Sequence, residues 1–232
     1  MGRFPQLPSQ KGSQKWIQKS VNERPELLDS KIRVELDMPE NENICWLSPL
    51  EEDEFAEYRD TQFVKLLGAK TEKPLEDFWP SRGPQWDALA RSNTGRLFLV
   101  EAKSHIPELI SSLRAENEDS IRLIHESLEE TKIYLTSSTE ADWSRRFYQY
   151  TNRLAHLYFL RVLNKLPAYL VFVYFVNDVE QNGPTSAPEW EGALKLLHSY
   201  FGLGRHKLQK YVCDLFIDVN TIGAFTPRVR NL

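Results

Sequence analysis

Two charged residues lie near the end of the apolar segment Leu97–Lys103, and they are the first candidates for chemistry in this chain. Side chains in a strand alternate between faces, so Glu101 and Lys103 share one face while Ala102 points the other way. A carboxylate and an ammonium at the end of an apolar strand cost free energy unless they are paired, solvated or bound to a metal. Their position therefore favours a metal site.

A third charged residue, Asp87, lies on the preceding predicted strand. The segments 85–91 and 96–104 both have strand character, and the Asn-Thr-Gly sequence between them is typical of a hairpin turn. If the hairpin pairs in its natural register, Asp87 lies close to Glu101. Carboxylate oxygens are the ligands that Mg²⁺ and Mn²⁺ prefer, so the two acids predict a metal site.

Lys103 adds the remaining function that phosphodiester hydrolysis requires. A metal ion polarises the phosphate and lowers the pKa of a bound water, and a neighbouring lysine orients that water and stabilises developing negative charge. We therefore predict that Asp87 and Glu101 bind the metal and that Lys103 positions the water. An E-x-K triplet alone is first explained as a surface ion pair. The prediction depends on its combination with an apolar strand, a turn and a preceding acid.

This arrangement resembles the PD-(D/E)XK, or restriction-endonuclease-like, superfamily, in which an acidic residue is followed after a variable gap by (D/E)-x-K on the next strand. Here the pattern is Asp87, then Glu101-Ala102-Lys103, and the resemblance covers about residues 51–176. Trp86 stands where the pattern has proline. The resemblance implies an α/β fold with a restriction-endonuclease-like core, a mixed β-sheet flanked by helices on both faces. It does not assign a subfamily.

The resemblance also implies further site residues. Members often use a glutamate from the helix before the hairpin, and Glu57 is the first candidate for this third ligand, with Glu54 behind it. Some members use a later helix to support the lysine or contact phosphate. In the predicted helix 143–163, Gln149 and Arg153 are the candidates, and Asn152 is an alternative.

The remaining elements follow from hydrophobic periodicity. We predict a flexible or partly helical N-terminal segment over residues 1–30, loose up to residue 13, and one nuclease-like domain over residues 31–232. The continuous apolar run Ala168–Val176 predicts a central strand covered on both faces. The other predicted elements are helices at 16–28, 51–67, 107–135 (in two pieces) and 189–200, and strands at 31–36 and 211–219.

Composition excludes several classes of protein. With 41% hydrophobic and 12% aromatic residues, the chain of 232 residues buries a core rather than remaining disordered. A net charge of -4 argues against a surface coated with basic residues. Two cysteines build neither a disulfide framework nor a four-cysteine zinc site. No apolar run approaches the roughly 20 residues that cross a bilayer, so we expect a cytoplasmic protein without membrane contact.

The sequence thus predicts a metal-dependent nuclease with Mg²⁺ or Mn²⁺ as cofactor and DNA, rather than RNA, as the expected nucleic acid. The alternative is a catalytically inactive module of the same fold that binds nucleic acid or a protein partner. Substrate structure, internal or terminal cutting, and action as a monomer or a homodimer stay open. Basic groups that would contact phosphate, if the fold gathers them, are Arg145-Arg146, Arg205 to Lys210, and Arg228-Arg230.

Overall fold

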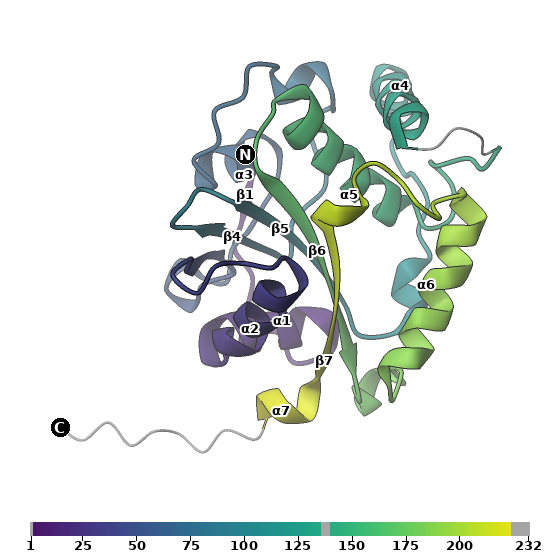
Figure 1. Ribbon diagram of the computed structural model, residues 1–232. Helices are drawn as coiled ribbons and strands as arrows, with labels where there is room; N and C mark the ends of the chain where they lie inside the picture. Colours follow the sequence, from purple (N-terminus) through teal and green to yellow (C-terminus); the bar gives the residue numbers. More distant parts are fainter. Residues whose placement is uncertain (1, 136–139, 224–232) are drawn as a thin grey trace.

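The computed structural model describes residues 2–135 and 140–223 (Figure 1). Its helices and strands, in chain order, are β1 (Arg3–Phe4), α1 (Gly12–Glu23), α2 (Pro25–Glu35), β2 (Ile44–Ser48), β3 (Glu57–Tyr58), α3 (Asp60–Leu66), β4 (Ala88–Ser92), β5 (Leu97–Lys103), α4 (Glu118–Leu135), α5 (Tyr148–Tyr158), β6 (Ala168–Val176), α6 (Ala187–Phe201), β7 (Val212–Asp218) and α7 (Val219–Gly223). Short 3-10 turns join several of them. Within these residues, no helix has the length and apolar character needed to cross a membrane.

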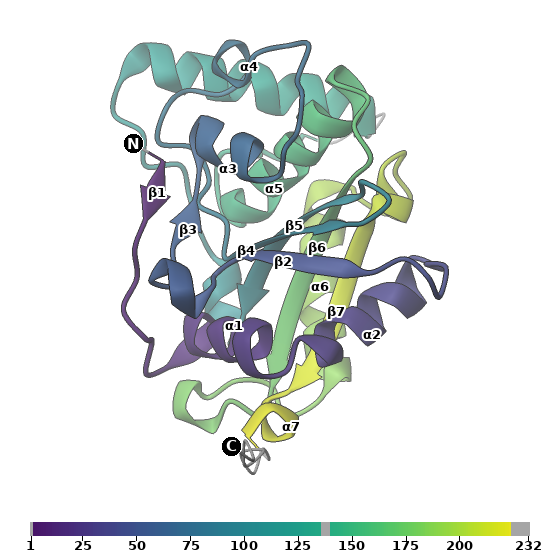
Figure 2. The ribbon, with the colours of Figure 1, turned by 90° about the vertical axis from the view of Figure 1, so that its left-hand side faces the viewer.

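Five strands form one mixed sheet in the order β2-β4-β5-β6-β7 (Figure 2). The β2, β4 and β5 strands pair antiparallel, whereas β6 and β7 continue parallel to β5. A parallel connection needs a long crossover, and α4 with α5 supplies the one between β5 and β6 while α6 supplies the one between β6 and β7. A separate antiparallel pair joins β1 to β3.

Helices cover both faces of the sheet (Figures 1 and 2). One face carries Leu97 and Leu99 of β5 and packs against α3, α4, α5 and α6. The other carries Phe98, Val100 and Ala102 and packs against α1, α2 and α7. The predicted alternation along β5 is confirmed, as is the broader prediction of a mixed sheet with helices on both faces. The strand predicted at Ala168–Val176 is β6, which is buried between β5 and β7.

Residues 31–36 were predicted as a strand, and this prediction is wrong because they lie mostly in α2. The alternation in this segment also fits a helix, since Leu28 and Ile32 are four residues apart and both are fully buried. Pro25 at the first helical position supplies the start signal. The edge strand β2 was not predicted, because its five residues follow a polar stretch and precede Pro49.

The helix predicted over residues 51–67 is also wrong for its first half. Glu54 and Phe55 have φ values of 55° and 48°, in the left-handed region that a right-handed helix excludes. The chain then extends through β3 before α3 begins at Asp60. The helix predicted at 143–163 starts at Tyr148 instead and ends in a π-helical turn over Phe159–Leu163.

The N-terminal residues contact the rest of the fold. Arg3 and Phe4 pair with β3, and the Arg3 guanidinium donates to Asp53 at 2.7 Å. This pairing corrects the expectation of a loose lead-in up to residue 13. In α1, the fully buried Ile17 faces the sheet surface that carries Phe98. Residues 12–35 are therefore helical almost throughout and help to cover one face of the sheet.

Candidate active site

Three acidic residues lie in a row across adjacent extended segments. The β4–β5 register pairs Ala88 with Val100, so the next position places Asp87 opposite Glu101. An isolated bridge pairs Tyr58 with Trp86, and the same register places Glu57 opposite Asp87. The structure therefore brings together the three acids that the sequence nominated, by way of strand pairing alone.

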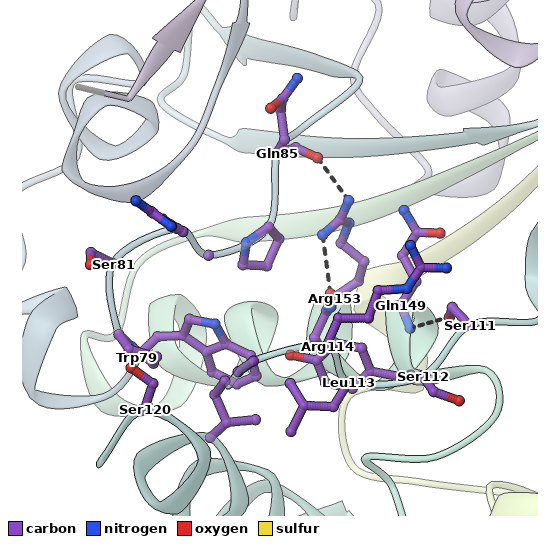
Figure 3. A pocket seen from close by; sticks show the side chains of 18 of the residues that line it. Trp79, Ser81, Gln85, Ser111, Ser112, Leu113, Arg114, Ser120, Gln149 and Arg153 are labelled. Atoms are coloured by element: carbon purple, nitrogen blue, oxygen red, sulfur yellow. Dashed lines mark hydrogen bonds between the residues drawn. The ribbon is translucent and has the colours of Figure 1, made fainter. Parts of the chain in front are cut away.

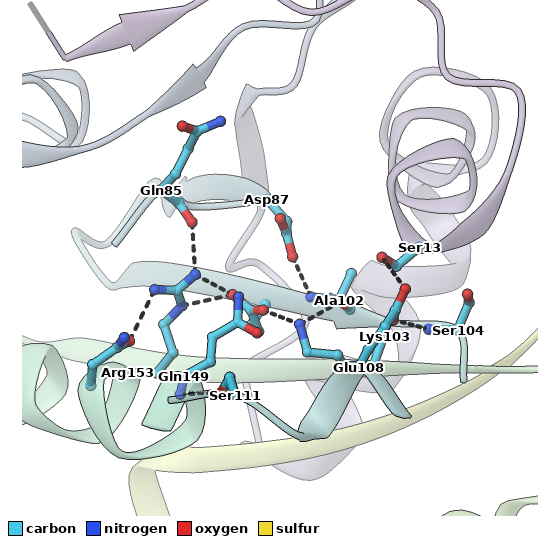
Figure 4. Close-up of polar contacts among 12 residues, drawn as sticks. Ser13, Gln85, Asp87, Ala102, Lys103, Ser104, Glu108, Ser111, Gln149 and Arg153 are labelled. Atoms are coloured by element: carbon cyan, nitrogen blue, oxygen red, sulfur yellow. Dashed lines mark hydrogen bonds and ion pairs between the residues drawn. The ribbon is translucent and has the colours of Figure 1, made fainter. Parts of the chain in front are cut away.

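Glu101 is the buried centre of this row, with only 1% of its surface exposed. Lys103 donates to one of its carboxylate oxygens, and Arg153 donates to the other through Nε at 2.6 Å (Figure 4). Burial by itself raises the pKa of this carboxyl group. The attraction of Arg153 and Lys103 outweighs that effect and leaves the Glu101 pKa below its usual value. Glu101 is thus an ionised carboxylate at neutral pH.

Arg153 is held from every side by the residues around it. Its exposed fraction is 2%, and its guanidinium also donates to the Gln85 carbonyl at 2.7 Å and to Asn152 Oδ1 at 3.0 Å. The guanidinium carbon lies 4.6 Å from the centre of the Trp86 ring, a cation–π distance. Trp86 therefore supports the arginine that neutralises Glu101.

Asp87 is half-buried, and one of its oxygens accepts the backbone N–H of Ala102 at 2.7 Å. Burial raises its pKa well above the usual value, and repulsion from Glu101 and Glu57 raises it further. The charge of Lys103 opposes this shift only in part. A cation bound beside Asp87 would relieve the repulsion that the protein itself leaves uncompensated.

Glu57 lies on β3 and not on a helix, which corrects the predicted setting of the third acid. Its side chain accepts hydrogen bonds from Gln85 and, at 3.1 Å, from Gln14 of α1. Burial raises the pKa of Glu57. These hydrogen bonds lower it, but they do not cancel the rise. The alternative acid, Glu54, is exposed and pairs with Arg3 at 2.9 Å, away from this row.

The polar residues of the helix predicted at 143–163 have different roles in the structure. Gln149 is half-buried, and its side chain extends from α5 toward β5 beside Arg153 (Figure 4). Asn152 is buried and orients Arg153. His156, one turn beyond, packs between Trp79 and Trp86 with its ring fully inside the core. Burial lowers the His156 pKa to about 3, so the ring is neutral and structural.

A pocket of about 1210 Å³ is lined by two acids of the row, Glu57 and Asp87, and Figure 3 shows side chains of its walls. Residues 79–85 form one wall and residues 111–117 form the other, while Glu57, Asp87 and Arg153 line the space between. Glu101 and Lys103 lie beneath and do not line it. The pocket therefore gives solutes access to Glu57 and Asp87, whereas Glu101 lies behind its ion pairs with Lys103 and Arg153.

The donor set fits a hard divalent cation in chemical type, since all three acids supply carboxylate oxygens. The side-chain geometry is less complete. Among residues 2–135 and 140–223, no group of three or more His, Cys, Asp or Glu side chains converges on one point. Both oxygens of Glu101 are engaged by Lys103 and Arg153. Binding a metal at this row thus requires Glu101 to share or exchange one of these contacts.

Several residues that contact the acids or line the pocket were not predicted from the sequence. Gln14 lies between the predicted loose lead-in and the helix predicted at 16–28, and only the fold brings it to Glu57. Gln85 was inside the predicted hairpin, but nothing in its type marked it as the residue that contacts both Glu57 and Arg153. Arg82 and Arg114 of the pocket walls were not considered. The predicted basic pair Arg228-Arg230 lies outside the described residues.

Comparison of the chain with protein-family models, with curated proteins and with solved structures found no match.

Proposed function

We propose that this chain is a metal-dependent nuclease that hydrolyses phosphodiester bonds, with DNA as its substrate. One observation carries the proposal: strand pairing places Glu57, Asp87 and Glu101 in a row that opens to a large pocket, with Lys103 two residues beyond Glu101 on the same face. A structural ion pair alone would not require a second and third acid with raised pKa values beside it.

The residues fall into complementary roles in this proposal. Asp87 and Glu101, with Glu57 as a third ligand, would hold Mg²⁺ or Mn²⁺, which would supply Lewis-acid polarisation of the phosphate and a water of lowered pKa. Lys103 would orient that water and place positive charge beside the phosphate. Arg153 keeps Glu101 ionised, and Gln14 with Gln85 keeps Glu57 turned toward the row.

The order of elements supports a restriction-endonuclease-like core. A helix, α3, precedes the antiparallel hairpin of β4 and β5, and α4 and α5 then lead to the parallel strand β6. The E-x-K triplet ends the middle strand of the sheet, and α5 delivers Arg153 to it. These features agree with the pattern from which the proposal started.

Two measurements on the same proteins test the proposal. Calorimetry with Mn²⁺ compares the wild type with the Asp87→Ala/Glu101→Ala variant, and a gel assay follows labelled single-stranded and duplex DNA with Mg²⁺, Mn²⁺ or a chelator. We expect binding and cleavage to disappear together in the double variant and cleavage to disappear with the chelator. Asp214→Asn is the matched control, because it also changes a half-buried acid on the same sheet face but outside the pocket.

The second candidate is a catalytically inactive module that binds nucleic acid or a protein partner. The specific observation in its favour is that both Glu101 oxygens are already paired with cations, so this carboxylate is electrostatically satisfied without a metal. Under this alternative the wild type neither binds Mn²⁺ nor cleaves. Metal-dependent cleavage that is lost in Asp87→Asn would rule it out.

A further inference from the structure

Two arginines in the pocket walls have guanidinium groups that nothing else engages. Arg82 lies in the wall of residues 79–85 and Arg114 in the wall of residues 111–117, and both side chains are exposed. Across residues 2–135 and 140–223, neither guanidinium has an ion pair or a hydrogen bond. Arg153, by contrast, donates three hydrogen bonds and forms an ion pair with Glu101. The walls thus carry the unpaired positive charge of the pocket.

Both wall segments are fixed by hydrogen bonds of their own backbone. The Asp60 carboxylate accepts the backbone N–H groups of Arg82 at 3.3 Å and Gly83 at 2.9 Å. This anchor holds Arg82 at a φ of 65°, a strained value for a residue with a side chain. A fixed backbone that presents a free guanidinium is organised in advance to bind an anion.

The opposite wall is anchored to the start of α5. The hydroxyl of Ser111 accepts the backbone N–H of Gln149 at 2.8 Å, and the Leu113 N–H donates to the Ser144 carbonyl at 2.9 Å. Figure 3 shows Ser81 on one side of the pocket and Ser111 and Ser112 on the other. Because the first N–H groups of α5 are occupied, Arg114 is the anion-binding group that this wall offers.

The burial of Glu101 and Lys103 below the pocket lining favours single-stranded over duplex DNA as the substrate. Glu101 and Lys103 have exposed fractions of 1% and 7% and lie below the pocket lining. Duplex DNA has a persistence length of about 150 base pairs, so it cannot fold a phosphate into such a recess without large distortion. One strand bends freely, and the half-buried Tyr148 in the pocket offers an aromatic surface on which a base can stack.

We propose that the pocket takes one unpaired strand of DNA, whose phosphates contact Arg82 on one wall and Arg114 on the other. This inference rests on the proposed nuclease function and narrows its substrate class. The nominated acids and Lys103 act on a phosphate between the two arginines. A duplex is then a substrate only where its strands have separated.

Fluorescence anisotropy with a labelled 12-nucleotide thymidine strand and a hairpin duplex of equal length tests the inference, in Ca²⁺ buffer over a range of salt concentrations. We expect the strand to bind more tightly than the duplex. Arg82→Ala and Arg114→Ala each weaken strand binding about tenfold. The double variant lowers the magnitude of the logarithmic salt slope by about 1.4, because each phosphate contact contributes about 0.7 for single strands.

Arg91→Ala is the matched control, because Arg91 is also an exposed arginine but lies outside the pocket. Equal binding of duplex and strand, no binding by the wild type, or a loss in the wall variants no larger than in Arg91→Ala overturns the inference. The proposed function is judged separately by cleavage in Mg²⁺ or Mn²⁺. Cleavage of duplex with no strand preference would sustain the nuclease and overturn the single-strand pocket.

Discussion

Two acids on the same face of the sheet, the buried Glu101 and the half-buried Asp214, have opposite pKa shifts. The β5–β6 register pairs Glu101 with Phe172, and the β6–β7 register pairs Phe172 with Asp214. The two carboxylates thus flank one phenylalanine. The pKa of Glu101 is below its usual value because two cations outweigh its burial, whereas burial raises the Asp214 pKa to about 6.

The surroundings explain the difference. Asp214 faces Tyr174, and the nearby Tyr150 hydroxyl pairs with His198 at 2.8 Å. Within the part of the chain that the structure describes, no lysine or arginine forms an ion pair with Asp214, and this residue does not line the pocket. Burial of a carboxylate is therefore no sign of a reactive site. The combination of several acids, fixed cations and access from solvent distinguishes the row at Glu101.

Removing the Arg153 cation from beside Glu101 should have the largest effect on the stability of the protein. Arg153→Met leaves the Glu101 charge buried with only Lys103, so we expect a loss of about 3–5 kcal/mol in the free energy of unfolding. Urea titration measures it. Arg161→Met is the control, since Arg161 donates to the Ala168 carbonyl and has no carboxylate partner among the residues that the structure describes. A loss in Arg153→Met no larger than in this control would contradict the expectation.

Catalysis should depend on Lys103 and not on Asp214. Lys103→Ala removes the group that positions the water, and we expect the single-turnover cleavage rate to fall by about 10²–10³-fold, the effect of losing one transition-state donor. Asp214→Asn should leave the rate within about threefold of the wild type. Equal rates for Lys103→Ala and the wild type would remove Lys103 from the mechanism.

The raised pKa of Asp214 predicts that the stability of the protein depends on pH. A raised carboxyl pKa means that the folded protein holds the Asp214 proton more tightly than the unfolded chain does, so stability falls as pH rises from about 4 through 6. Two pKa units at about 1.4 kcal/mol each give about 3 kcal/mol. We therefore expect Asp214→Asn to exceed the wild type in stability by up to this amount at pH 8 and to match it near pH 4. Asp119→Asn, at an exposed position, should show no such gap in urea titrations.

The smallest effect is expected at the edge of the acid row. Glu57→Gln removes one of the three negative charges but keeps a side chain of the same shape between Gln14 and Gln85. Repulsion on Asp87 then decreases, so its pKa falls while Mn²⁺ binding weakens less than in Asp87→Ala/Glu101→Ala. Calorimetry at two pH values measures both changes. Unchanged Mn²⁺ affinity would show that Glu57 is not a ligand.

The sequence predicted the centre of the fold better than its edges. Apolar alternation and a turn identified the β4–β5 hairpin, and the continuous run Ala168–Val176 matches β6. These strands are long and buried, so their pattern is imposed by packing on both faces. The two-residue strand β3 has no such pattern, because it is defined by pairing with β1 more than 50 residues away.

The same limit applies to the site. Asp87, Glu101 and Lys103 are close in sequence, so strand geometry alone predicts their proximity. Nothing local places Gln14 beside Glu57, or Trp86 beneath the guanidinium of Arg153, because both contacts arise from packing of distant elements. Sequence periodicity reports the face on which a residue lies, but it does not report which partner covers that face.

The contact between Gln14 and Glu57 links the chemistry to the order of folding. α1 carries Gln14 and Ile17, and it docks on strands that extend to β7. Lys15 also pairs with Glu180 at 3.2 Å. Contacts this distant in sequence form late, because closing long loops is entropically unfavourable. The N-terminal segment is synthesised first, yet the sheet face on which α1 docks includes β5, so a nascent chain that ends before β5 lacks both Glu101 and part of the surface that places Gln14 beside Glu57.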